Sequence, residues 1–329
     1  MKIVTLEEHV SFPEITSRIP PEATINNAFE HSPAIQKLSP KLADITGERL
    51  LSMDNNNISM QIVSVTGPGA ELLNAETGPV LAKDYNDRIA QKIKDNTHRF
   101  SAFAHLPMSA PEAAADELER TVKSYGFKGA LINGLTNNEF LDHPKFGPIF
   151  GRAESLNVPI YLHPGMPPQR VVDAYYSGLP NYAGMLLSIA GWGWHSETAI
   201  HVLRLFVSGV FDRYPKLKLI IGHMGEMIPM MMARCDAAFR PGQAGINQRT
   251  LIDTLQEQVH ITTSGLFTLP PLITALDTFG VDNIMFSVDY PFSTNEQGSE
   301  YLDKIKMRLG EEMLTKIASA NADKLLNLF

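Results

Sequence analysis

The stretch KLIIGH, residues 218–223, is a short apolar run that ends in a glycine and a histidine. Continuous apolar runs of this length are typical of parallel strands that are covered on both faces. The sequence contains about eight such runs, the others being KIVTL at 2–6, QIVSVT at 61–66, FSAFAHL at 100–106, KGALIN at 128–133, PIYLH at 159–163, QVHITT at 258–263 and NIMFSVD at 283–289. We therefore predict a buried parallel strand at each of these runs.

Helix-like segments separate the runs, at residues 75–96, 110–125, 196–209 and 225–239. Ser109 is a candidate N-cap for the second segment, and Gly126 is a natural residue to follow its end. Strands that alternate with helices form βα units, and eight such units predict a distorted (β/α)8 TIM barrel. An open doubly wound sheet is the alternative, but no Gly-x-Gly-x-x-Gly motif follows any of the runs.

Two stretches are longer than a minimal barrel requires. They are residues 10–55, after the first strand, and residues 164–195, which begin PGMPPQRVVDAYYSGLPNYAGM, after the fifth. Both would leave the barrel from the carboxyl ends of strands, where loops build pockets. The sequence contains no internal repeat, low-complexity tract or linker. We therefore predict one domain over residues 1–329.

The composition narrows the possible functions. The chain has 329 residues, of which 44% are hydrophobic, so it is long enough to bury one large core. Its net charge is −8 and its basic residues are not clustered, which argues against nucleic acid or an anionic membrane as a partner. Cys235 is the single cysteine, so no intrachain disulfide can form. Acidic residues stand from position 7, where a signal peptide would need its apolar stretch, and no window is apolar over the length of a membrane-spanning helix, so we expect a cytoplasmic protein.

Polar side chains stand at the ends of four of the predicted strands. Glu7 and His9 follow the first strand, His163 ends the fifth, His223 the sixth and Asp289 the eighth. In a barrel these ends converge on one face, and Glu7 and His9 are two residues apart, so they share a side of an extended chain. Imidazoles and carboxylates suit a divalent ion such as Zn²⁺ or Mn²⁺. Each residue alone could also be a structural histidine or a helix cap.

The motifs around these residues resemble those of the amidohydrolase superfamily. They are LEEH at 6–9, KDYNDRIA at 83–90, YGFKGALING at 125–134, VPIYLHPGMP at 158–167, SGVFDRYPKLKLIIGHMGE at 208–226, ITTSG at 261–265 and FSVDYPF at 286–292. The set is most similar to the branch that contains aminocarboxymuconate semialdehyde decarboxylase and the non-oxidative hydroxybenzoate decarboxylases. LEEH together with GALING most resembles the γ-resorcylate (2,6-dihydroxybenzoate) and 2,3-dihydroxybenzoate decarboxylases.

The resemblance implies a ligand set for the metal. By this resemblance Glu7, His9, His163 and Asp289 hold one divalent metal, either Mn²⁺ or Zn²⁺. Binuclear members of the superfamily carry a bridging lysine or glutamate at the end of the fourth strand. The chain has Asn133 there, so the resemblance implies a single ion.

The resemblance also implies roles in catalysis. Asp289 would protonate the ring carbon that bears the carboxylate, while the metal chelates the carboxylate and the ortho hydroxyl. His223 would stabilise the phenolic oxygen, and Glu226 would fix the tautomer of His223. Arg234 and Asn133 would contact the substrate. Glu226 could instead be a first-turn acid of a helix, and Arg234 a surface residue.

The implied reaction is a reversible, non-oxidative decarboxylation of a small aromatic acid such as 2,6- or 2,3-dihydroxybenzoate. The alternatives are a metal-dependent hydrolase of a lactone, ester or amide, a hydratase, and a binding protein on an inactive barrel. Branch members commonly form homodimers or homotetramers, and the Met-rich helix would suit such an interface. His105 reads as a core residue and His195 as a helix cap. The aromatic residues of the second insertion could line a pocket or pack between loops: Tyr175, Tyr176, Tyr182, Trp192 and Trp194.

Overall fold

Short parallel strands form the centre of the molecule, which the computed structural model describes over residues 1–24, 33–67 and 69–329. The strands are β1 (Val4–Val10), β2 (Met60–Val65), β3 (Phe100–Ala102), β4 (Ala104–His105), β5 (Ala130–Asn133), β6 (Ile160–His163), β7 (Leu219–Ile221), β8 (Val259–Thr262) and β9 (Ile284–Met285). They pair in parallel, in the orders β1-β2-β3 and β4-β5-β6-β7-β8-β9. Because β3 and β4 are the two halves of the strand predicted at 100–106, the strands fill the eight positions of a (β/α)8 barrel.

Backbone hydrogen bonds keep the barrel wall continuous between β3 and β4. The N–H of Phe103 donates to the carbonyl of Val63 at 3.0 Å, and the N–H of Ala104 donates to that of Gly129 at 2.8 Å. The chain therefore changes neighbours at Phe103 without leaving the barrel wall.

Different contacts close the seam between β9 and β1. The N–H of His9 donates to the carbonyl of Tyr290 at 2.8 Å. The hydroxyl of Ser287 accepts the N–H groups of Leu6 and Glu7, at 3.1 and 2.6 Å. A side chain thus replaces part of the backbone ladder where the last strand meets the first.

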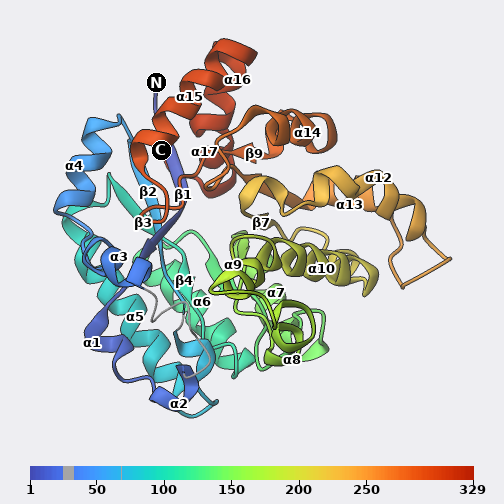
Figure 1. Cartoon of the computed structure of the whole chain (residues 1–329), viewed down its shortest axis with the longest axis horizontal. Helices are drawn as coiled ribbons and strands as arrows, with labels where there is room; N and C mark the ends of the chain where they lie inside the picture. The colour runs from blue at the N-terminus through green and yellow to red at the C-terminus, as the bar shows by residue number, and fades with distance from the viewer. Residues whose placement is uncertain (25–32, 68) are drawn as a thin grey trace.

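Helices surround the strands (Figure 1). They are α1 (Pro13–Thr16), α2 (Pro21–Thr24), α3 (Pro33–Ala43), α4 (Glu48–Asn55), α5 (Gly78–Ile93), α6 (Pro111–Tyr125), α7 (Gly147–Leu156), α8 (Gln169–Val171), α9 (Ala183–Ser188), α10 (Gly193–Val207), α11 (Val210–Arg213), α12 (Ile228–Ala238), α13 (Leu251–Gln258), α14 (Leu269–Phe279), α15 (Asn295–Leu309), α16 (Glu311–Thr315) and α17 (Asn321–Leu326). No helix within the described ranges is long and apolar enough to cross a membrane.

Two clusters of buried side chains make the core. Along β6, Ile160 and Leu162 join the larger cluster, whereas Tyr161 joins the smaller one, because alternate side chains of a strand point to opposite sides. The smaller cluster lies inside the barrel and includes Ala322 and Leu326 of α17. Helix α17 therefore packs against the side chains inside the barrel.

The two long stretches carry helices. Helices α1 to α4 lie within residues 10–55, of which 25–32 fall outside the described residues. Helices α8 and α9 lie within 164–195, with a π-helical turn (Val172–Tyr176) between them. The assignment of the whole chain to one domain stays a prediction.

Some predicted boundaries are wrong. Helix α6 has Ala110 as its N-cap and no side-chain cap, so Ser109 does not have the predicted role, although Gly126 follows the helix with φ 68° as expected. The helix predicted at 225–239 begins only at Ile228, because every residue of 223–227 has a positive φ. Strand β1 extends to Val10, so Glu7 and His9 lie within it rather than after it.

Candidate active site

A bulge in β1 turns Glu7 and His9 toward the interior of the barrel. Leu6 belongs to the interior cluster, whereas Val10 packs in the outer one. Unbroken alternation from Leu6 would send Val10 inward as well, so the strand must contain an irregularity between them. The pairing register against β2 does shift just before Glu8. As a result Glu7 and His9 face the interior, and Glu8 faces the outside of the barrel wall.

The residues predicted at the strand ends come together. His163 Nε2 lies 3.3 Å from Glu7 Oε1. His9 Nε2 lies 3.2 Å from Asp289 Oδ1. His223 Nε2 lies 3.6 Å from Glu7 Oε1 and 3.9 Å from Asp289 Oδ2. The fold therefore brings these five side chains to one point, and their roles as ligands stay predictions.

The facing atoms of this cluster suit a cation. Glu7 Oε1 and both ring nitrogens of His9 are buried, and none has a hydrogen-bond partner among the described residues. His163 Nδ1 lies 2.7 Å from the carbonyl of Pro164, and donation there leaves the Nε2 lone pair directed at Glu7. Buried polar atoms without partners are rare, and of these Glu7 Oε1 and His9 Nε2 face the same cluster of side chains. Their donor types fit a single divalent ion such as Mn²⁺ or Zn²⁺.

A group of hydroxyls holds the second oxygen of Glu7. Oε2 accepts short hydrogen bonds from the hydroxyls of Tyr161 and Ser264, and the hydroxyl of Thr262 lies 3.4 Å away. Gly222 packs against the same oxygen, since a Cβ at this residue would lie only 2.5 Å from Oε2. These contacts fix the carboxylate, so Oε1 is held toward His163 and His223.

The electrostatics of the cluster also favour a cation. Burial favours the neutral acid, but His223, His163 and His9 outweigh it and hold the pKa of Glu7 below its usual range. Burial lowers the pKa of His9 to about 4, so its ring is neutral near pH 7 and able to ligate. Burial and the charge of Glu7 raise the pKa of Asp289 to about 8. Adjacent carboxylates resist joint ionisation, which a bound cation would relieve.

Glu226 joins two imidazoles beside this cluster. Its carboxylate is fully buried, with Oε1 2.6 Å from His223 Nδ1 and Oε2 2.7 Å from His195 Nδ1. Burial disfavours the cationic imidazole, but Glu226 and Glu7 outweigh it and raise the pKa of His223 to about 10. The predicted pair of His223 and Glu226 is therefore present as a hydrogen bond. His195 belongs to the same group, whereas the sequence indicated only a helix cap.

An unusual backbone holds this group in place. His223, Met224, Glu226 and Met227 all have positive φ, between 44° and 68°, and so does Gly225. Residues other than glycine adopt this backbone conformation at a cost in conformational energy, so it persists only where the surrounding structure enforces it. Asp289 shares the feature, with φ 69°.

Glu8 binds the backbone on both sides of Asp289 from outside the barrel wall. Its Oε1 accepts the Ser287 hydroxyl and the Val288 N–H, each at 3.1 Å. Its Oε2 accepts the Tyr290 N–H at 3.1 Å. Burial raises the pKa of Glu8 to about 8, although these donors favour the carboxylate. Glu8, which lies between the predicted ligands Glu7 and His9, thus holds the segment that carries the predicted ligand Asp289.

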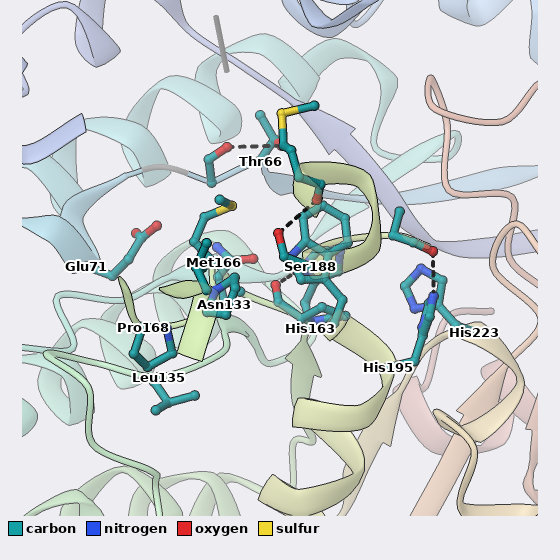
Figure 2. A pocket seen from close by; sticks show the side chains of 18 of the residues that line it. Thr66, Glu71, Asn133, Leu135, His163, Met166, Pro168, Ser188, His195 and His223 are labelled. Atoms are coloured by element: carbon teal, nitrogen blue, oxygen red, sulfur yellow. Dashed lines mark hydrogen bonds between the residues drawn. The ribbon is translucent and has the colours of Figure 1, made fainter. Parts of the chain in front are cut away.

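The cluster opens into a cavity of about 1000 Å³, part of which is shown in Figure 2. Asn133 and Asp289 line it, as do Tyr176 and Trp194 of the second insertion. The cavity is thus partly aromatic and large enough for a small ring compound. The other insertion aromatics are exposed and outside its lining: Tyr175, Tyr182 and Trp192.

Arg234 is the predicted site residue that the fold does not bring to the cavity. It lies exposed on α12 and is not part of the cavity lining. The helix begins only at Ile228, after the left-handed turn, which changes the direction that a continuous helix from 225 would give. Within one chain Arg234 therefore lies outside the cavity lining.

Comparison with known proteins identifies the family. Residues 34–328 match the family model described as amidohydrolase. The chain is 38% identical to decarboxylase orsB of Emericella nidulans, over 99% of this chain and 97% of that protein. It is 36% identical to gamma-resorcylate decarboxylase of Rhizobium sp., over 99% and 98%. The chain is also similar to dihydroxybenzoic acid decarboxylase from Polaromonas sp., whose crystal structure contains bound manganese and the inhibitor 2-nitroresorcinol. The two sequences are 33% identical, and the structures superpose with a TM-score of 0.87 over 99% of this chain and 97% of that one. The chain therefore belongs to the amidohydrolase family.

Proposed function

We propose that the protein is a metal-dependent carboxy-lyase that removes CO₂ from an ortho-hydroxybenzoic acid such as 2,6- or 2,3-dihydroxybenzoate. The observation that carries this proposal is the cluster of Glu7, His9, His163 and Asp289, whose facing atoms lie beside the His223 pair at the cavity. Full-length relatives that are themselves named decarboxylases support it.

We propose that Glu7, His9, His163 and Asp289 bind one divalent ion, with Mn²⁺ favoured over Zn²⁺. Manganese in the related Polaromonas structure supports that preference. Bound there, the ion would supply positive charge for the carboxylate and phenolic oxygens of the substrate.

Asp289 is the residue that moves the proton. In the proposed reaction its carboxyl group donates a proton to the ring carbon that bears the carboxylate. The bond from that carbon to the carboxylate then breaks, its electron pair returns to the ring, and CO₂ leaves. Asp289 regains a proton from water, so one proton replaces one CO₂ in each turnover.

His223 stabilises the negative charge on the phenolic oxygen of the substrate. Its Nδ1 is bound to Glu226, so Nε2 is the nitrogen that faces the ligand cluster. The buried carboxylate keeps the imidazole cationic, which lets Nε2–H donate to the phenolic oxygen as the ring accepts its proton. Asn133 and the aromatic side chains Tyr176 and Trp194 would bind the ring from the cavity wall.

Assembly is a further part of the proposal. Met230 and Met231 of α12 are 76% and 48% exposed, a large apolar surface for one helix. We propose a homodimer or homotetramer in which this surface is covered, and Arg234 would then lie close to the interface. A cytoplasmic location stays a prediction.

The test is CO₂ release from a panel of salicylate and 2,3-, 2,4- and 2,6-dihydroxybenzoate, with Mn²⁺-loaded protein and with protein treated with a chelator. We expect release only with the ion, and none from the Asp289→Asn variant. If every acid stays intact while about one ion per chain is retained, the lyase proposal fails. Hydrolysis of lactones and esters would then be the reaction to measure.

A further inference from the structure

The cavity wall carries a carboxylate that the proposed reaction does not use. Glu71 lies on the short 3₁₀ turn Ala70–Leu72 after β2, lines the cavity, and has a side chain that is only 12% exposed. Burial alone would favour its neutral form, but His105 and the N–H of Gly69 outweigh it and lower the pKa of Glu71. The wall therefore presents a negative charge near pH 7.

The carboxylate of Glu71 has unused capacity to accept hydrogen bonds. Oε1 accepts one N–H, that of Gly69 at 2.9 Å, although a carboxylate oxygen can accept two. Oε2 lies 3.3 Å from His105 Nε2, and no other donor reaches this oxygen in the described part of the chain.

Glu71 lies in the same cavity wall as the ligand cluster, with Asn133 between. Asn133 pairs with His163 across β5 and β6, so the two side chains leave the barrel at the same level. A Cβ at Gly67 would lie 3.3 Å from Glu71 Oε1 and 3.5 Å from Asn133 Nδ2, so both polar atoms border the space that this glycine leaves open. In the view of Figure 2, Asn133 lies between Glu71 and His163.

We infer that Glu71 forms a specificity subsite that binds a hydrogen-bond donor on the substrate ring. The inference rests on the proposed function, because the ring carboxylate must be held at the ligand cluster for the ring to extend toward Glu71. The substrate class is then an ortho-hydroxybenzoic acid with a further hydroxyl or amino group. An aromatic diacid is excluded, because its second carboxylate would meet the charge of Glu71.

The physical reason is the sign of the charge at this wall. A hydroxyl that donates to a buried carboxylate makes a charge-assisted hydrogen bond, which is about twice as strong as a neutral one. A second carboxylate would instead be placed beside a like charge in a cavity with little water, where repulsion is weakly screened.

The probes for this inference are nitrophenols, because a nitro group imitates a carboxylate in shape but cannot leave as CO₂. The reference probe is 2-nitrophenol. The probes with one more hydroxyl are 2-nitroresorcinol, 3-nitrocatechol and 4-nitroresorcinol, and 4-hydroxy-3-nitrobenzoate carries a carboxylate instead. Calorimetry gives the dissociation constant of each probe from Mn²⁺-loaded wild type, Glu71→Gln and Glu71→Asp. Glu76→Gln is the control, since it removes an exposed carboxylate from the same loop.

In wild type and in the Glu76→Gln control, at least one dihydroxy probe should bind about tenfold more tightly than 2-nitrophenol, and the carboxylate probe more weakly. In Glu71→Gln, the dihydroxy probes and the carboxylate probe should each have a dissociation constant close to that of 2-nitrophenol. Glu71→Asp, which keeps the charge, should still bind the carboxylate probe more weakly than 2-nitrophenol. If the dissociation constants relative to 2-nitrophenol are the same in wild type and Glu71→Gln, the subsite is overturned. Because no probe is turned over, the result does not depend on whether the acids are decarboxylated.

Discussion

The hydroxyl of Ser287 accepts the backbone N–H of Glu7 at 2.6 Å. It also accepts the N–H of Leu6, at 3.1 Å. Two consecutive N–H groups can reach one oxygen only where a strand is bulged, because in a regular strand they point in opposite directions. Ser287 therefore joins the last strand segment to the irregularity that turns Glu7 into the barrel.

We expect Ser287→Ala to loosen this seam. The N–H groups of Leu6 and Glu7 would lose their acceptor while buried, at a cost of about 1–3 kcal/mol in the free energy of unfolding. Mn²⁺ should also bind more weakly, because Glu7 would no longer be held. Urea unfolding and a metal titration measure the two effects. Ser155→Ala is the control, because this exposed hydroxyl bonds, among the residues that the structure describes, to the carbonyl of Arg152 alone. Equal losses in both variants would contradict the prediction.

The strand positions could be predicted because burial on both faces leaves a continuous apolar run, as in β6 and β7. The bulge could not, because it depends on Ser287, which lies almost the whole chain away from Leu6. The sequence indicated Glu7 and His9 as residues after a strand, and only the fold shows that they lie within one.

Site residues that meet only through the packing of helices could not be predicted from the sequence either. Glu226 was predicted from its spacing to His223, since the two lie three residues apart. His195 lies on α10, and its contact with Glu226 depends on how that helix packs against the 223–227 turn. No local pattern indicates that packing. Glu71 likewise has no motif of its own and becomes visible only as part of the cavity wall.

Gly222→Ala should weaken metal binding without a backbone penalty. The residue has φ −80°, which any amino acid can adopt, but the added Cβ would lie 2.5 Å from Glu7 Oε2. The carboxylate must then move, so we expect the affinity for Mn²⁺ to fall by about tenfold or more. Gly151→Ala is the matched control, because the nearest atom to its Cβ outside its own helix, among the described residues, would be a ring carbon of Tyr214 at 3.6 Å. A Gly222→Ala protein with wild-type affinity in calorimetry would refute this reading of the contact.

The buried His201 should make stability depend on pH. Burial, with a smaller effect of Arg204, lowers its pKa to about 3, and its Nε2 accepts the N–H of Leu141 at 2.8 Å. Between that value and the unfolded pKa near 6.5, the unfolded chain binds a proton that the folded chain does not. Stability from this residue is therefore complete above about pH 6.5 and falls as the pH is lowered.

The expected slope from His201 is about 1.4 kcal/mol per pH unit between roughly pH 4 and 6. His201→Gln should be less stable at pH 7 but should lose this part of the slope. Urea unfolding at a series of pH values measures it. His98→Gln, which changes an exposed histidine, should keep the wild-type slope, and an unchanged slope in His201→Gln would show that other groups cause the dependence.

Glu8 should act on the metal through Asp289. Its carboxylate accepts the N–H groups of Val288 and Tyr290, which flank Asp289 in its left-handed conformation. Glu8→Gln places an amide donor against one of these N–H groups, so the segment should shift, and the affinity for Mn²⁺ should fall by about tenfold, or 1.4 kcal/mol.

A double-mutant cycle separates this role from a general loss of structure. If Glu8 acts by positioning Asp289, then Glu8→Gln should lower the affinity for Mn²⁺ much less in an Asp289→Asn background than in wild type. Additive losses would mean that Glu8 affects the other ligands or the fold as a whole. Glu112→Gln, an exposed carboxylate in the first turn of α6, should change the affinity in neither background. Calorimetric titration of these proteins with Mn²⁺ therefore decides whether the second glutamate of LEEH holds the ligand at the far end of the chain.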